Sequence, residues 1–220
     1  MSRQYKIAVI RVATLDNEER LSQHGRLIEK YFPDIITKSY CIQDQYNGVH
    51  DDASHEIATE KIVNLVKDIQ DEYEGIVISC AGDPAVEILK REIDIPVVGA
   101  GHSVASFSLN FGEKIGVLGI REEAPEVIER ILGHKLVGSV KPQKVNNTND
   151  LLTDEGRQEV IESAHELQKT GADAIVLACT GMSTIGIAKF LNENLQIPVI
   201  DPVYSEALVI SSLCKYKSLF

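Results

Sequence analysis

The sequence has no long apolar run and no visible sorting segment. None of its apolar stretches approaches the roughly 18 consecutive residues that a membrane-spanning helix needs. Residues 1–6 are mostly polar and lead directly into a short apolar run, so no secretory signal is visible. We therefore expect a cytoplasmic protein that does not act on membranes.

Basic side chains are also scarce. The 220 residues include 22 Lys and Arg against 33 Asp and Glu, which gives a formal net charge of −11. Nucleic acids and anionic membrane surfaces are bound by clusters of Lys and Arg, so neither is an expected partner. A small anionic ligand remains compatible with this composition, because the residues of a pocket decide its local charge.

Paired metal and redox motifs are missing as well. None of the four cysteines forms a Cys-x-x-Cys pair, which argues against a thioredoxin-like site and a zinc ribbon. The His and acidic residues of 50–56 lack the two-His helical spacing of a zinc site, and 99–101 lacks the third glycine of a dinucleotide fingerprint. We expect no metal and no cofactor. Hydrophobic residues make up 44% of the chain, enough for a core without disulfides, so the cysteines are expected as free thiols.

The most informative feature that is present is an internal duplication. Residues 75–82 and 173–181 each form an apolar, β-branched run that ends in Cys, one further residue and Gly. The cysteines are Cys80 and Cys179. Two halves folded alike and facing each other would bring these thiols to opposite walls of one cleft.

The pattern of strands and helices repeats with the duplication. Expected strands lie at 6–10, 35–42, 75–80 and 95–99, and again at 114–118, 135–140, 173–179 and 197–201. Continuous apolar strands that alternate with helices are typical of parallel sheets covered by helices, so the predicted fold class is α/β. We expect a first domain of 1–100 plus 205–220 and a second of 101–204, because the final helix can pack back on the first half.

Both duplicated cysteines fall where parallel sheets bind ligands, beyond the carboxyl ends of strands. Each precedes an expected helix, with Asp83 as the cap in the first copy, and the helix N-terminus is expected to lower the thiol pKa below about 8.5. A single Cys at the end of an apolar strand is usually a core residue, but the duplicated placement favours a reactive pair. Cys41 and Cys214 lack this context and are interpreted as structural.

One asymmetry between the copies concerns Arg11. It ends the first strand and aligns with Gly119 of the second copy. At the mouth of the cleft it could grip a substrate carboxylate bidentately from one side only. The alternative is a solvent-facing arginine paired with one of the acidic residues.

Four segments carry a resemblance to the aspartate/glutamate/hydantoin racemase superfamily, and within it to the hydantoin racemase branch. They are Cys80-Ala81-Gly82-Asp83-Pro84, Ile95-Pro96-Val97-Val98-Gly99, Cys179-Thr180-Gly181-Met182 and Pro198-Val199-Ile200-Asp201-Pro202. The similarity extends over nearly the whole chain, because both halves fit. It implies two Rossmann-like domains related by a pseudo-twofold axis, with the active-site cleft between them.

The resemblance also implies a cofactor-independent racemase with one catalytic cysteine from each domain, Cys80 and Cys179. One cysteine would remove a proton as the thiolate, and the other would deliver a proton to the opposite face as the thiol. The substrate would be a small molecule, of hydantoin type or an amino acid. The residues implied in binding it are Ala81, Gly82, Asp83, Thr180, Gly181 and Met182. A homo-oligomer, such as a dimer, is implied by the resemblance alone.

Other functions on the same scaffold stay open. The chain could be an aspartate/glutamate racemase proper, a decarboxylase or a cis–trans isomerase. A decarboxylase of this type typically retains one of the two cysteines, so the presence of both favours racemisation. A ligand-binding protein without turnover could also retain both thiols as pocket lining.

Overall fold

The computed structural model describes residues 3–219, which form two four-stranded parallel sheets. The first sheet has the order β2-β1-β3-β4 and the second has the order β6-β5-β7-β8. The first-half strands are β1 (Tyr5–Arg11), β2 (Ile35–Cys41), β3 (Gly75–Ser79) and β4 (Val97–Gly99). The second-half strands are β5 (Ile115–Leu118), β6 (Leu136–Val140), β7 (Ala174–Leu177) and β8 (Val199–Ile200). The same strand order in both halves confirms the predicted α/β class and its Rossmann-like duplication.

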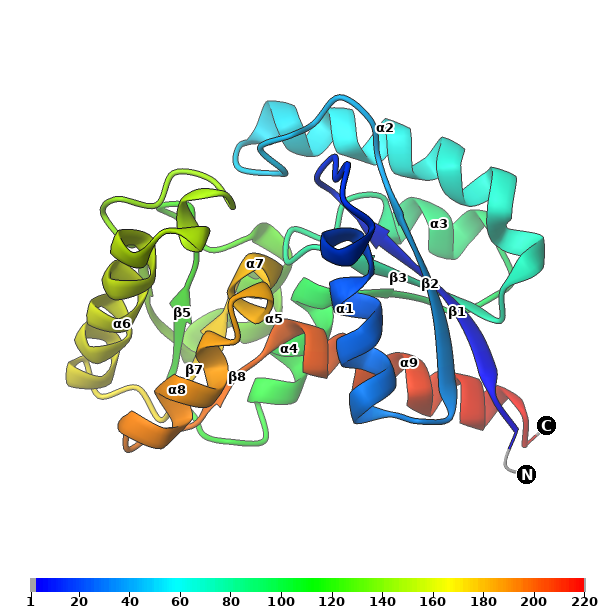
Figure 1. The fold of residues 1–220 in the computed structure, drawn as a ribbon. Helices are drawn as coiled ribbons and strands as arrows, with labels where there is room; N and C mark the ends of the chain where they lie inside the picture. The colour runs from blue at the N-terminus through cyan, green and yellow to red at the C-terminus, as the bar shows by residue number, and fades with distance from the viewer. Residues whose placement is uncertain (1–2, 220) are drawn as a thin grey trace.

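Helices connect these strands and cover the sheets, as Figure 1 shows. The helices up to the second half are α1 (Glu18–Tyr31), α2 (Asp52–Ile69), α3 (Val86–Glu92) and α4 (Ala100–Ser108). The later helices are α5 (Glu126–Leu132), α6 (Asp154–Lys169), α7 (Thr180–Thr184), α8 (Ile187–Asn194) and α9 (Pro202–Lys217). Short 3-10 turns are η1 (Gln70–Glu72), η2 (Gly133–Lys135) and η3 (Asp150–Leu152).

The inner strands form from short runs that are apolar on both faces. Every residue of β3, β5 and β7 is buried, as expected for parallel strands that have helices on both sides. The helices begin at polar caps: the Asn17 side chain accepts a bond from the backbone N–H of Arg20, and Asp51 forms a capping box with Ser54. These local signals position the strand ends that carry the candidate site.

Two helices pack across the boundary between the halves. α9 follows β8, yet Val203, Ala207 and Ile210 pack with the apolar residues of β1 and β3. In the same way α4 follows β4, and its Val104 and Ala105 pack with β5 and β7. The two helices contact each other, and in Figure 1 the red α9 runs along the lower side of the first half. The division into 1–100 plus 205–220 and 101–204 stays a prediction, and its residues 1, 2 and 220 lie outside the described residues.

The expected helix cap at Asp83 is wrong. The helix after Cys80 begins only at Val86, and Asp83 lies before it with a φ of 50°. The Asp83 carboxylate instead accepts bonds from the backbone N–H groups of Gly101 and His102, both at 2.7 Å. It therefore caps α4, the helix that begins at Ala100, 17 positions later in the chain.

Across residues 3–219, no helix combines the length and the apolar character that crossing a membrane requires.

Candidate active site

Cys80 and Cys179 occupy equivalent places in the two halves. Each lies just beyond the carboxyl end of an inner strand of its sheet: Cys80 is the first residue after β3 and Cys179 the second after β7. This is where the strand order reverses, the usual ligand-binding position of an open parallel sheet. The carbonyl of Cys80 accepts a bond from the N–H of Asp83, and that of Cys179 accepts one from Met182. The duplicated sequence thus gives two similar tight turns.

Both cysteines line one cavity of about 50 Å³ between the halves. The first half contributes Val12, Val49, Cys80, Ala81 and Gly82. The second contributes Gly119, Ile120, Arg121, Glu123, Pro125, Thr148, Ala178, Cys179 and Thr180. Cys80 is 8% exposed and Cys179 is 6% exposed, so each thiol reaches this space while remaining largely shielded from solvent.

A direct hydrogen bond ties the two cysteine turns together. The Thr180 hydroxyl donates to the carbonyl oxygen of Ser79 at 3.1 Å, and both groups are buried. Thr180 follows Cys179 and Ser79 precedes Cys80 in the chain. This bond joins the two turns directly across the boundary between the halves.

The expectation that helix N-termini lower the thiol pKa values is wrong. Burial raises the pKa of Cys80 to about 12 and that of Cys179 to about 11. Backbone N–H groups act in the opposite direction: that of Gly82 bonds the Cys80 sulfur, and those of Gly181 and Met182 bond the Cys179 sulfur. Desolvation of the thiolate outweighs these donors in the closed cavity.

Three of the six residues implied in substrate binding beside the cysteines line the shared cavity: Ala81, Gly82 and Thr180. Gly181 lines the adjoining pocket instead. The Met182 side chain is fully buried in the apolar core of the second half, so only its backbone faces the site. Asp83 is absent from the cavity lining, because its carboxylate caps α4 and lies beside a different pocket.

Arg11 is buried, so the alternative of a solvent-facing arginine is wrong, while a contact with the substrate stays a prediction. Its Nη1 donates to the backbone carbonyls of Arg20 at 3.0 Å and Leu21 at 3.3 Å. Burial lowers its pKa to about 10, so it stays charged near neutral pH. It does not line the cysteine cavity but the pocket next to it, which also contains Thr180 and Gly181.

A buried polar chain beside the site was missed from the sequence. His24 Nδ1 lies 2.8 Å from Ser79 Oγ, which donates to Glu206 Oε1 at 2.6 Å. His24 Nε2 lies 2.8 Å from the Thr184 hydroxyl of the other half. His24 and Glu206 are fully buried, and burial lowers the pKa of His24 and raises that of Glu206. The signal available was the position of both polar residues on apolar faces of their helices.

Arg121 was also missed, and it is the cationic side chain on the cavity wall. Its Nη2 lies 2.6 Å from Asp52 Oδ1, so it links the loop after β5 to the start of α2. The Asp52 side chain is 93% exposed, so the ion pair adds little stability. The neighbouring His55 of α2 lies beside the Cys80 turn, with its Nε2 3.0 Å from the Gly82 carbonyl. Over residues 3–219, no three His, Cys, Asp or Glu side chains gather as metal ligands.

The fold and the site together define an α/β protein of two similar halves, with a pair of thiols facing one cavity at the strand ends. Residues 24–207 match the sequence model of the family described as Asp/Glu/hydantoin racemase. The chain belongs to this family.

The individual relatives have low sequence identity to this chain. A hydantoin racemase of Paenarthrobacter aurescens is 29% identical over 149 residues, which cover 64% of this chain and 61% of that protein. The match therefore spans less than two thirds of that relative's length. Among solved structures, the allantoin racemase from Klebsiella pneumoniae superposes with a TM-score of 0.82 at 19% identity, covering 97% of this chain and 89% of that one. The glutamate racemase isoform RacE1 from Bacillus anthracis gives a TM-score of 0.69 at 16% identity, covering 99% and 84%. Both likenesses concern the fold.

Proposed function

We propose that the protein is a cofactor-independent racemase that uses Cys80 and Cys179 as its two bases. The observation that carries the proposal is the shared cavity, which both thiols line from equivalent turns of opposite halves. A single carbon atom placed between them would have one sulfur on each face. Membership in the Asp/Glu/hydantoin racemase family supports the same reaction.

In the proposed reaction, one cysteine acts as a thiolate and removes the hydrogen from a carbon next to a carbonyl group. The C–H electron pair moves into the carbonyl, and the enolate then takes a proton from the other cysteine on the opposite face. The second cysteine is left as the thiolate, so the reverse direction uses exchanged roles. One thiol has to stay protonated at the start, because two thiolates in one small cavity repel each other.

The surroundings assign different tasks to the neighbouring groups. The N–H groups of Gly82 and Gly181 bond the cysteine sulfurs, so they stabilise the thiolates. The Thr180 hydroxyl donates to the carbonyl of Ser79, so it holds the turns in place rather than stabilising the enolate. Arg121 supplies positive charge at the cavity wall, where it would favour the oxygen of an enolate.

We expect a hydantoin-type substrate before a free amino acid. A cyclic imide acidifies its ring C–H far more than a free carboxylate does, and raised thiol pKa values make the thiolates strong bases once formed. The curated relative is a hydantoin racemase and a structural neighbour is an allantoin racemase, which supports this order. Aspartate and glutamate are the next substrates to test, because the family includes enzymes described for them.

The test follows hydrogen exchange and optical rotation of single enantiomers in D₂O, with hydantoins, aspartate and glutamate. Wild type should lose rotation as deuterium enters the stereocentre. Cys80→Ser and Cys179→Ser should each lose about 100-fold or more in turnover, because general acid–base groups typically contribute that much. Cys41→Ser and Cys214→Ser are matched controls outside the cavity and should retain turnover.

Other results of the D₂O experiment would point to a different function. Full turnover by either Cys80→Ser or Cys179→Ser would reject the two-base reaction. Loss of mass from the substrate would indicate decarboxylation, and a rise in melting temperature without exchange would indicate a binding protein. A cytoplasmic location is part of the proposal, because the reaction needs free thiols. A homo-oligomeric state is also part of it, supported by the family resemblance, and size-exclusion chromatography with light scattering tests the oligomeric state.

A further inference from the structure

A second pocket, of about 290 Å³, adjoins the cavity that holds the cysteines. The two spaces share Val12, Thr148 and Thr180 in their walls. The cavity itself, at about 50 Å³, is much smaller than typical ligand pockets of about 300–1,000 Å³. A substrate whose reacting carbon lies between the sulfurs therefore needs neighbouring room for its substituent, and this pocket provides it.

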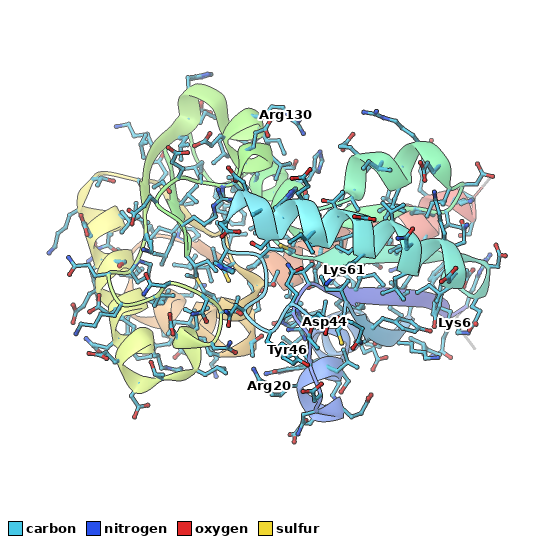
Figure 2. The ribbon with its side chains drawn as sticks, turned by 90° about the horizontal axis from the view of Figure 1, so that it is seen from above. Lys6, Arg20, Asp44, Tyr46, Lys61 and Arg130 are labelled. Carbon is cyan, nitrogen blue, oxygen red and sulfur yellow. The ribbon has the colours of Figure 1, made fainter. Side chains whose placement is uncertain are left out.

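The pocket lies at one side of the molecule. Arg20 and Tyr46 belong to its wall, and Figure 2 shows them near each other. Arg130 lines a different pocket and lies at the opposite side of the same view. The adjoining pocket is thus distinct from the space beside α5.

Arg11 gives this pocket a buried positive charge. In the sheet Arg11 pairs with Ser79, the residue before Cys80, so its position is fixed by the register of β1 and β3. One guanidinium nitrogen, Nη1, is held by the carbonyls of Arg20 and Leu21. Among residues 3–219, no carboxylate lies within ion-pair distance of Arg11, and Arg11 is one of the residues that line the pocket.

Glu206 is the acidic residue whose charge acts most on Arg11, but it is a poor counter-ion. It is fully buried and accepts its hydrogen bond from Ser79. Its other oxygen, Oε2, has no partner in the described part of the chain. Burial raises its pKa well above the usual value, which weakens it as a counter-ion, and it forms no ion pair with Arg11 within the described residues. A buried charge without a partner is costly unless a ligand supplies one.

The rest of the wall fits the same ligand. Arg20 adds a second guanidinium at the exposed rim, opposed there by Asp16 alone among acidic residues of the lining. Side-chain amide groups complete the wall, from Asn17, Gln23 and Asn149. Such groups solvate a carboxylate without competing for the arginine as a second acid would.

We propose that this pocket binds a carboxylate on the substrate's side chain, with Arg11 as the specificity-determining residue. The proposal rests on the proposed function for the position of the reacting carbon between the cysteines. It names the substrate class: hydantoins, or the corresponding amino acids, that carry an acidic substituent. Arginine is suited to this task because its planar fork holds a carboxylate through two parallel bonds.

The test compares two hydantoins of nearly equal shape, 5-(2-carboxyethyl)hydantoin and 5-(2-carbamoylethyl)hydantoin. Wild type should racemise the acid with a kcat/KM about 10- to 100-fold higher than the amide, as expected for a charge-assisted bond. In Arg11→Gln that ratio should fall to about 1, and in Arg20→Gln it should fall a few-fold because the rim is solvent-screened. Arg26→Gln, on the same helix as Arg20 and bonded to Ser22, is the matched control and should keep the wild-type ratio.

Arg11 also holds two carbonyls of α1, so Arg11→Gln could lower stability. The acid-to-amide ratio of kcat/KM in wild type and in the exposed Arg20→Gln variant does not depend on the stability of Arg11→Gln. A wild-type ratio of 1 or below overturns the proposal. A ratio that is high but unchanged in a folded Arg11→Gln protein overturns it as well.

Binding without turnover separates this proposal from the racemase proposal. In a Cys80→Ser, Cys179→Ser double variant, the acid should raise the melting temperature more than the amide, and Arg11→Gln should abolish the difference. If wild type exchanges no hydantoin hydrogen but this Arg11-dependent rise is seen, the racemase proposal falls and the carboxylate pocket stands. If wild type racemises both hydantoins equally and the rise is equal, the pocket falls and the racemase proposal stands.

Discussion

The hydroxyl of Thr180 and the carbonyl of Ser79 form a buried bond of 3.1 Å between the two cysteine turns. Each turn belongs to a different half of the molecule, so its own sheet fixes its orientation but not its distance from the other. The Thr180–Ser79 bond joins the turns directly, in addition to the packing of α4 and α9 across the boundary and the contact of His24 with Thr184. A reaction that moves a proton between two faces of one carbon depends on this spacing more than on either turn alone.

Thr180→Val tests that relationship. Valine retains the shape of threonine but cannot donate, so the free energy of unfolding should fall by about 1 kcal/mol, the usual net value of one hydrogen bond. The turnover of the proposed racemase should fall more, by about 10- to 100-fold in kcat, because small misplacements of reacting groups carry large kinetic penalties. Urea unfolding and D₂O exchange rates measure the two effects.

Thr170→Val is the control for this change. The Thr170 hydroxyl also bonds a backbone carbonyl, that of Leu167 at 2.7 Å, but within α6 and its end, away from the cavity. A similar loss of stability with unchanged kcat is expected. Equal kinetic effects in Thr170→Val and Thr180→Val would contradict the positioning role.

The raised thiol pKa values predict a strong pH dependence. With Cys179 at about 11 and Cys80 at about 12, the thiolate fraction in the free protein grows as the pH rises, and kcat/KM should increase from neutral pH into the alkaline range. Cys179 should ionise first, because it has two backbone donors and the charge of Arg11 beside it. Ultraviolet titration of thiolate absorbance in Cys80→Ser and in Cys179→Ser assigns each step.

The same shifts act on stability. Both folded-state values lie above the reference of 9.0, so protonated thiols stabilise the fold below about pH 9, and that contribution is lost as the pH rises toward 11 and 12. If either cysteine formed a thiolate below about pH 8.5, burial would not raise its pKa, and the helix N-terminus would lower it as expected from the sequence.

Asp83→Asn tests the link between the Cys80 turn and α4. The two carboxylate oxygens accept from the N–H groups of Gly101 and His102, and an amide offers one acceptor and one donor in their place. One N–H would lose its partner and face another donor, so the free energy of unfolding should drop by about 1–3 kcal/mol. Burial raises the pKa of Asp83 from 3.8 to about 7, so wild type loses stability as the pH rises from about 4 to 7, and the deficit of the non-titrating Asp83→Asn should be largest below about pH 4 and smaller above pH 7.

Glu87→Gln provides the comparison on the neighbouring helix α3. Glu87 is exposed and pairs only with Lys90, so this change should stay within about 0.5 kcal/mol of wild type. An Asp83→Asn protein as stable as Glu87→Gln in urea would show that the cap on α4 contributes nothing.

The architecture could be predicted because its signals are local and repeated. The apolar runs that end at Cys80 and Cys179 are short, β-branched and followed by glycine, and each half of the chain contains one of them. Parallel strands that are buried on both faces need such runs. Because the two halves have the same strand order, the residues at the carboxyl ends of equivalent strands lie at equivalent positions. The shared cavity followed from the duplication.

The details that could not be predicted depend on partners distant in sequence. Asp83 has the local context of a helix cap, yet it bonds Gly101 and His102 in the helix that follows the next strand. The thiol pKa values depend on how completely the halves close over the sulfurs, which no local pattern encodes. Glu206 lies in an otherwise apolar helix face, and its partner Ser79 is 127 positions earlier.

The buried His24 should make the free energy of unfolding depend on pH in the acid range. Burial lowers its pKa well below 6.5, so the folded protein holds it neutral between Ser79 and Thr184. Below about pH 6.5 the unfolded chain binds a proton at this residue that the folded chain does not, so this contribution to stability is lost as the pH falls. Each pH unit in that window corresponds to about 1.4 kcal/mol.

His24→Gln removes the titrating group, and the pH dependence of its effect is the measurement. Near pH 7.5 the variant should be less stable than wild type by about 1–3 kcal/mol, because one side of the bridge between Ser79 and Thr184 is lost. Near pH 5.5 the difference should shrink by about 1 kcal/mol, because wild type alone bears the penalty of keeping His24 neutral. The exposed His134→Gln should change stability by less than about 0.5 kcal/mol at both values. A difference for His24→Gln that stays constant or grows toward pH 5.5 in urea unfolding would mean that His24 takes up its proton in the folded state, with Ser79 and Thr184 both turned to accept from it.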